Sequence, residues 1–201
     1  MSEIDDGVIK YHRDFTKSDA LKPDQYRDLE LWRKKLYQLG LIGEYPIVNI
    51  GYGNLSQRIK QNNFIITGTQ TGKFAELNGE HYTVVTDHNI EKNLIQARGP
   101  IDASSEALTH AAIYAHQSLI NAVFHIHDKK LWKLMIEHSL PHIAANIPYG
   151  TVEMARAVEE LIGNSTHGIF AMAGHEDGIV SYGQSLDEAG QAILELVERF
   201  K

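Results

Sequence analysis

The stretch that most restricts how this chain can fold is residues 99–128, GPIDASSEALTHAAIYAHQSLINAVFHIHD. Its pattern predicts a loop, a helix, a turn and then a short strand that ends at His127. Within the predicted helix, Glu106, His110 and Tyr114 are spaced four residues apart and therefore share one face. Because the helix and the strand follow each other closely, we expect the rest of the fold to form around them.

The predicted strand carries two histidines on one face. Strand side chains alternate with a period of two, so Val123, His125 and His127 point to one side, while Phe124 and Ile126 point to the other. Two imidazole rings on one side of a strand can bind the same metal ion. They can equally be core histidines that hydrogen-bond inside the protein, and the motif alone leaves both interpretations open.

A metal site in this chain would need a third ligand. The chain has no cysteine, which excludes thiolate ligands and leaves His, Asp or Glu to bind an ion. Among its 11 histidines, His175 is the best candidate, because it follows a predicted strand in a loop bounded by glycines. His167 is the second choice, and the role of His142 is ambiguous.

The start of the predicted helix offers groups that suit an anion and a proton. Ser104 and Ser105 predict, first of all, a helix cap. A helix N-terminus also binds phosphate through its free N–H groups, and two hydroxyl groups would add donors to such a site. Glu106 either complements the positive end of the helix or, beside a metal, carries protons as an acid and base.

Two glycine-containing loops resemble nucleotide-binding motifs but lack essential residues. In the first, residues 51–58, Ser56 replaces the third glycine of a dinucleotide-binding fingerprint. The second, residues 68–73, is one residue shorter than a P-loop, and Phe74 stands where Ser or Thr must bind magnesium. We therefore exclude both nucleotide sites. The two loops are either plain turns or segments whose N–H and hydroxyl groups bind an anion.

The whole chain, residues 1–201, is predicted to form one domain that mixes helices and strands. Amphipathic and capping patterns predict helices at residues 23–41, 129–138, 151–162 and 185–200. Apolar runs predict strands at residues 64–67, 82–86, 93–97, 168–173 and 179–182. Residues 1–20 are polar and predict an N-terminal arm or irregular lead-in, and residues 141–150 predict a loop. Helices interleaved with strands indicate an α/β or α+β three-layer fold.

Charge and hydropathy exclude two classes of partner. A formal net charge of -7 without a basic stripe argues against nucleic-acid binding. No apolar run reaches the length of a membrane span, and the acidic start MSEIDDG differs from a signal peptide. We therefore expect a cytoplasmic protein that binds neither nucleic acid nor membrane.

Taken in order, these motifs resemble the class II aldolase/adducin family over roughly residues 25–200. The family has a Gly-Asn-aliphatic-Ser-x-Arg loop, a Thr-Gly loop after a strand, a Ser-Ser-Glu-x3-His-x3-Tyr helix start, a His-x-His strand, a Pro-Tyr loop and a late histidine. The matching segments are residues 53–58, 67–72, 104–114, 125–127 and 148–151, and His175. Each motif alone is unspecific, but their common order favours the metal-binding interpretation of the strand histidines.

The resemblance implies a three-layer α/β/α fold around a mostly antiparallel central sheet. It also implies a divalent metal, usually zinc, bound by His125, His127 and His175, with Glu106 as the catalytic acid and base. The substrate-phosphate site carried over from the family consists of Gly53, Asn54, Thr71, Gly72, Ser104 and Ser105. Family members are commonly tetramers with the active site at a subunit interface, so we expect a homotetramer.

The resemblance also implies a reaction of the fuculose-phosphate aldolase type. A ketose 1-phosphate, which is a phosphorylated sugar, would be cleaved to a dihydroxyacetone-phosphate-like fragment and an aldehyde, with the metal as the Lewis acid that stabilises an enediolate. Alternatives on the same scaffold are a 4-epimerase, a dehydratase, a decarboxylase and a non-catalytic adducin-like module. Glu176 and Asp177 extend the loop after His175 relative to the family pattern and could also approach the metal.

Overall fold

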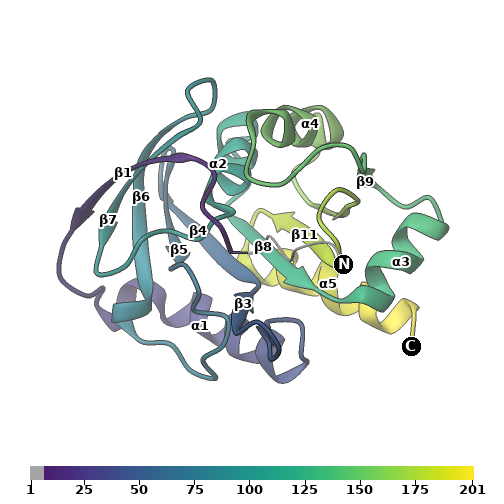
Figure 1. Cartoon of the computed structure of the whole chain (residues 1–201), viewed down its shortest axis with the longest axis horizontal. Coiled ribbons are helices and arrows are strands. Elements are labelled where there is room, and N and C mark those ends of the chain that lie inside the picture. Colours follow the sequence, from purple (N-terminus) through teal and green to yellow (C-terminus); the bar gives the residue numbers. More distant parts are fainter. Residues whose placement is uncertain (1–6) are drawn as a thin grey trace.

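The computed structural model describes residues 7–201, whose arrangement is drawn in Figure 1. The helices are α1 (Pro23–Gln38), α2 (Ala107–His116), α3 (Lys129–Glu137), α4 (Val152–Ile162) and α5 (Leu186–Arg199), with a 3-10 turn at Gly79–His81. The strands are β1 (His12–Lys17), β2 (Gly43–Tyr45), β3 (Ile50–Tyr52), β4 (Asn54–Lys60), β5 (Asn63–Thr67), β6 (Tyr82–Asn89), β7 (Leu94–Gly99), β8 (Ala122–His127), β9 (His142–Ile143), β10 (Gly168–Met172) and β11 (Gly178–Gly183). None of the helices in this described part is long and apolar enough to cross a membrane.

A nine-stranded sheet runs through the molecule in the order β1-β7-β6-β5-β4-β8-β11-β10-β9. The edge pairs β1–β7 and β9–β10 are parallel, and the pairings between them are antiparallel. The mostly antiparallel sheet that the family resemblance implies is therefore confirmed. β2 and β3 form a separate two-stranded hairpin beside this sheet.

Strand β8 is buried along its whole length because both of its faces are covered. Val123 belongs to the hydrophobic core on the side of α2 and α4, whereas Phe124 and Ile126 belong to the core on the side of α1 and α5. Figure 1 shows these two helix pairs on opposite sides of the sheet. The alternation predicted for this strand is therefore confirmed, and it places His125 and His127 on the side of α2.

Side-chain caps fix where three of the helices begin. The N–H of the third helical residue is accepted by Asp128 Oδ1 in α3, by Thr151 Oγ1 in α4 and by Ser185 Oγ in α5. Each cap satisfies one of the N–H groups that a helix start leaves without a partner. Helix α2 is different, because its N-cap residue is Glu106 and no side chain caps it. The serine pair therefore lies in the turn before the helix.

Three segments differ from what the sequence predicts. Part of the expected N-terminal arm, His12–Lys17, is strand β1, and residues 1–6 of that arm lie outside the described residues. The first glycine-containing loop, residues 51–58, is mostly strand, because β4 pairs with both β5 and β8. A two-residue strand, β9, interrupts the expected loop at residues 141–150. Backbone pairing forms these strands, and their side chains show little apolar alternation, so the sequence pattern does not reveal them.

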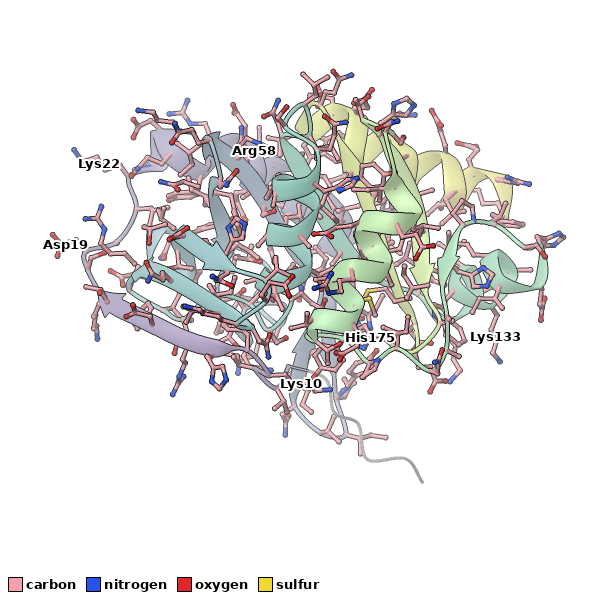
Figure 2. The ribbon with its side chains drawn as sticks, turned by 90° about the horizontal axis from the view of Figure 1, so that it is seen from above. Lys10, Asp19, Lys22, Arg58, Lys133 and His175 are labelled. Atoms are coloured by element: carbon pink, nitrogen blue, oxygen red, sulfur yellow. The ribbon has the colours of Figure 1, made fainter. Side chains whose placement is uncertain are left out.

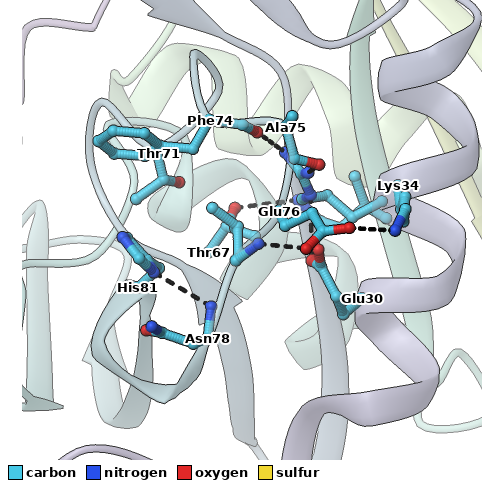
Figure 3. A network of polar contacts seen from close by, with 12 residues as sticks. Glu30, Lys34, Thr67, Thr71, Phe74, Ala75, Glu76, Asn78 and His81 are labelled. Carbon is cyan, nitrogen blue, oxygen red and sulfur yellow. Dashed lines mark hydrogen bonds and ion pairs between the residues drawn. The ribbon is translucent and has the colours of Figure 1, made fainter.

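A buried ion pair on α1 holds the segment that follows the second glycine-containing loop (Figure 3). Arg33, whose side chain is 1% exposed, lies with Nε 3.0 Å from Glu30 Oε2. Its other two nitrogen atoms donate to the carbonyl oxygens of Phe74 and Ala75. Glu30 in turn accepts the N–H of Leu77 and the hydroxyl of Tyr82. Residues 74–77 are therefore fixed to α1 by charged hydrogen bonds.

We predict that Arg33→Met lowers the free energy of unfolding by about 3 kcal/mol, because it removes the buried guanidinium that holds the partly buried Glu30 carboxylate and the carbonyl oxygens of Phe74 and Ala75. Denaturant unfolding followed by circular dichroism measures this change. The control is Lys34→Met at the next position, whose ammonium group contacts the exposed carboxylate of Glu76 and should matter little. Equal losses in the two variants would contradict a structural role for the buried pair.

Candidate metal centre

Three histidines meet at the end of the central strand β8. His125 and His127 project from β8, and His175 lies in the turn that leads into β11. The distances between ring centroids are 4.7 Å for His125 and His127, 5.3 Å for His125 and His175, and 4.9 Å for His127 and His175. One ring nitrogen from each lies within 4.8 Å of the others, and all three residues are buried. The geometry suits three imidazole ligands around one ion.

The approach of the three rings depends on a glycine at the start of β11. Gly178 pairs with His127 across the two strands. A Cβ atom at this position would lie 2.5 Å from His175 Cδ2 and 3.1 Å from His125 Nε2. A side chain at Gly178 would therefore push the rings of His175 and His125 apart.

Burial keeps the strand histidines in the form that binds metals. Removal from water lowers the pKa of His125 and of His127 well below the usual value, and the neighbouring imidazole of His175 lowers both further. His125 Nε2 is buried and has no hydrogen-bond partner among residues 7–201. A neutral imidazole with such a nitrogen is the donor that a divalent cation needs. The three histidines therefore fit a metal ion.

A carboxylate lies beside this cluster. The side chain of Glu106 is 3% exposed, and its Oε1 lies 4.0 Å from Nε2 of His175. Its Oε2 accepts a hydrogen bond of 3.0 Å from the hydroxyl of Thr109. Glu106 is the residue directly before α2, and from this position its carboxylate approaches the ring of His175. A buried carboxylate in this place can exchange protons with a molecule bound at the cluster.

The expected phosphate-binding residues line one pocket with the histidines and Glu106. The pocket encloses about 380 Å³ of empty space, counted out to its open mouth. From the sequence-predicted set, the lining includes Gly53, Asn54, Thr71, Gly72, Ser104 and Ser105. Close backbone packing shapes this wall: a Cβ atom at Gly72 would lie 2.3 Å from the carbonyl oxygen of Tyr52. The structure thus brings all ten predicted site residues to one place.

The alternative ligands lie elsewhere or have other partners. The side chain of His167 is 65% exposed and lies 3.8 Å from Glu188, and His142 is an exposed residue of β9. Glu176 forms a 2.5 Å ion pair with Lys129. Within residues 7–201, the histidine trio is the one group of His, Asp or Glu side chains close enough to share an ion, and it does not include Asp177.

His110 and Tyr114, which share a helix face with Glu106, form a buried hydrogen-bond network. The hydroxyl of Ser56 on β4 lies 2.7 Å from His110 Nδ1 and 2.7 Å from the hydroxyl of Tyr114. Burial lowers the pKa of His110 to about 3, so its ring stays neutral at physiological pH. These contacts fix α2 against the sheet and support the position of Glu106.

The sequence reasoning missed several residues around the site. The ring of Tyr149, from the Pro-Tyr loop, lies 4.6 Å from His175, and the Lys10 ammonium group lies 3.8 Å above the Tyr149 ring. Figure 2 shows Lys10 and His175 at the same edge of the molecule. The hydroxyl of Tyr45 contacts His127 Nδ1. Of these three, only Tyr149 lies in a motif that the sequence singled out.

The sequence profile of the family described as the Class II Aldolase and Adducin N-terminal domain matches residues 36–201. The chain therefore belongs to the class II aldolase/adducin family, as its motifs predict. No curated protein sequence matches the chain at a significant level.

Solved structures of similar fold include several aldolases. YgbL from Klebsiella pneumoniae, for which aldolase, epimerase and decarboxylase activities are suggested, is 22% identical, with a TM-score of 0.65 over 89% of this chain and 87% of that one. L-fuculose-1-phosphate aldolase from Thermus thermophilus is 23% identical, with a TM-score of 0.61 over 89% and 88%. A sugar-phosphate aldolase from Thermotoga maritima is 15% identical, with a TM-score of 0.64 over 88% and 91%. At these identities the likeness shows a common fold.

We predict that the metal-free protein loses stability as the pH falls below about 6.5, the pKa of an unfolded histidine. Above this pH the rings of His110, His125 and His127 are neutral in both the folded and the unfolded protein. Below it the unfolded chain binds protons that the buried rings exclude, so the free energy of unfolding falls by up to about 1.4 kcal/mol per pH unit for each ring.

Denaturant unfolding in the presence of a chelator, between pH 7.5 and pH 5, measures this slope. His110→Gln should reduce it, because one of the buried rings is removed. His12→Gln, which changes an exposed side chain of β1, is the matched control and should preserve the slope. An equal slope in His110→Gln and the unaltered protein would contradict the prediction.

Proposed function

We propose that this chain is a metal-dependent aldolase on a three-layer α/β/α scaffold. It cleaves a ketose 1-phosphate to a dihydroxyacetone-phosphate-like fragment and an aldehyde. The observation that carries the proposal is the joint placement of three buried histidines, a buried carboxylate and a wall rich in Gly, Ser and Thr around one pocket. Family membership and the aldolases among similar structures support it.

His125, His127 and His175 would bind the ion, and we propose zinc, which three imidazoles and one open position suit. When bound, a divalent ion supplies Lewis acidity that stabilises negative charge on substrate oxygen atoms. The three ligands come from rigid elements, namely the central strand and a tight turn closed by the Gly178 N–H. The site therefore needs little rearrangement to accept its metal.

Glu106 is the proposed catalytic acid and base. It accepts the proton of the hydroxyl group next to the carbon–carbon bond that breaks, and the electrons of that bond move toward the ketone. It then returns a proton to the carbon atom left on the phosphate-bearing fragment, so that protons and charge balance over the reaction. The distance of 4.0 Å between its Oε1 and Nε2 of His175 supports this role.

The remaining residues of the pocket hold the phosphate in our proposal. The glycine-containing segments around Gly53 and Gly72 and the turn at Ser104 and Ser105 offer backbone N–H groups and hydroxyls to an anion. Binding energy from the phosphate would orient the sugar against Glu106. We also propose that the chain acts as one domain in a cytoplasmic homotetramer, in line with its family.

We predict about one divalent ion per chain in the purified protein and little in His175→Ala, measured by inductively coupled plasma mass spectrometry. His167→Ala, which changes an exposed histidine outside the cluster, should keep the metal. Glu106→Gln should also keep it but lose roughly 10²–10⁴-fold in activity toward ketose 1-phosphates. A wild-type protein without metal after incubation with zinc would contradict the proposal. Epimerised, dehydrated or decarboxylated products would replace the aldolase by another enzyme of this scaffold.

We predict that Ser105→Ala chiefly raises KM for phosphorylated substrates, by roughly 10-fold or more, because a hydrogen bond to a charged group is lost. Steady-state kinetics with a phosphorylated sugar measures the change, and the unphosphorylated sugar is the control. An unchanged KM would restrict Ser105 to a structural role in the turn before α2.

A further inference from the structure

The hairpin formed by β2 and β3 contacts the metal centre from outside the main sheet. Its two aromatic residues, Tyr45 and Tyr52, lie with ring centroids 4.7 Å apart. The Tyr52 ring lies 5.3 Å from the ring of His127, and the Tyr45 ring meets His127 edge-on at 6.0 Å. At the tip of the hairpin, Ile47 is 96% exposed. The turn of the hairpin is therefore exposed to solvent, while the two tyrosine rings beside it contact a proposed metal ligand.

One hydrogen bond joins the hairpin to that ligand. The hydroxyl of Tyr45 lies 2.8 Å from Nδ1 of His127. A hydroxyl can donate or accept, so this contact is compatible with either tautomer of the neutral ring. If Tyr45 donates, the proton of the ring sits on Nε2 and blocks it. If Tyr45 accepts, the proton sits on Nδ1 and Nε2 has a free electron pair for a metal.

Asn54 makes the equivalent contact to the second strand ligand. Its amide Nδ2 lies 3.1 Å from Nδ1 of His125. In this orientation Asn54 Oδ1 and His125 Nε2 are both buried without a hydrogen-bond partner among residues 7–201. A half-turn of the amide exchanges its oxygen and nitrogen atoms. Oδ1 then accepts the Nδ1 proton of His125, which leaves His125 Nε2 for an ion.

We propose that Tyr45 and Asn54 are positioning residues of the metal centre. Each accepts the Nδ1 proton of one strand histidine, so that both Nε2 atoms carry electron pairs directed at the ion. Outer hydrogen bonds of this kind fix the tautomer and the ring angle of metal-binding histidines. This inference rests on the metal site of the proposed function. It adds one consequence, namely that metal binding and the attachment of the hairpin to the protein strengthen each other.

The coupling follows from linkage. If the Tyr45 contact strengthens metal binding by some factor, then metal binding strengthens the attachment of the hairpin by the same factor. The strands β2 and β3 pair with each other and remain outside the nine-stranded sheet, so side-chain contacts such as this one attach the hairpin to the rest of the protein. We therefore expect residues 43–52 to open more often in the metal-free protein.

The test compares Tyr45→Phe with Tyr52→Phe. Both substitutions keep an aromatic ring in the stack and remove one hydroxyl group. The Tyr52 hydroxyl donates instead to the Gly40 carbonyl oxygen at 3.3 Å, so Tyr52→Phe is the matched control. Zinc affinity is measured by competition with a chromophoric chelator, and the visible spectrum of the Co²⁺-loaded protein reports the ligand geometry.

We expect Tyr45→Phe to weaken zinc binding by roughly 10–100-fold and to change the Co²⁺ spectrum, with little change in Tyr52→Phe. Zinc should slow hydrogen exchange at residues 43–52 in the wild type but not in Tyr45→Phe. Unchanged zinc affinity and an unchanged spectrum in Tyr45→Phe would overturn the positioning role while the metal centre stands. Absence of metal binding in the wild type would overturn the proposed function itself.

Discussion

The gathering of three imidazole rings inside the protein is the constraint on which the other features of the site depend. Polar nitrogen atoms are costly to bury unless they find partners. The fold holds the rings in place, because β8 is paired with β4 on one side and with β11 on the other. Gly178 leaves room for the rings. Hydrogen bonds with Tyr45 and Asn54 meet the Nδ1 atoms of the two strand histidines, and in the proposed metal centre the Nε2 atoms bind the ion.

Much of the fold could be predicted from local patterns. The period of two around His125 correctly separated its face from that of Phe124, because both faces of β8 are buried and each side chain has a defined core to enter. The helices at 23–38, 152–162 and 186–199 were predicted to within three residues, since their apolar stripes or caps are local signals. Strand β1 was missed because its residues are mostly exposed and its pairing with β7 depends on the backbone alone.

The residues of the candidate site were predicted from family motifs rather than from local structural patterns. Its ten residues lie in motifs whose order along the chain marks the family, so the resemblance named them before any geometry was known. Tyr45 and Lys10 carry no such signal. Tyr45 meets His127 across 82 positions of sequence, and only the folded sheet brings the two together. Residues that reach the site from distant segments outside the motifs are therefore the ones that motif reasoning omits.

The strand order of the sheet also bears on how the protein forms in the cell. The inner position of β8 requires β4 on one side and β11 on the other, and β11 (Gly178–Gly183) follows β8 only after two helices and two further strands. During synthesis, an emerging chain that has not reached His175 holds two of the three histidines and lacks the strand that covers them. Non-local pairing of this kind is slow to form. His175 is thus the last of the three proposed ligands to be synthesised, so the proposed centre can hold its ion with all three rings only after β11 has paired with β8.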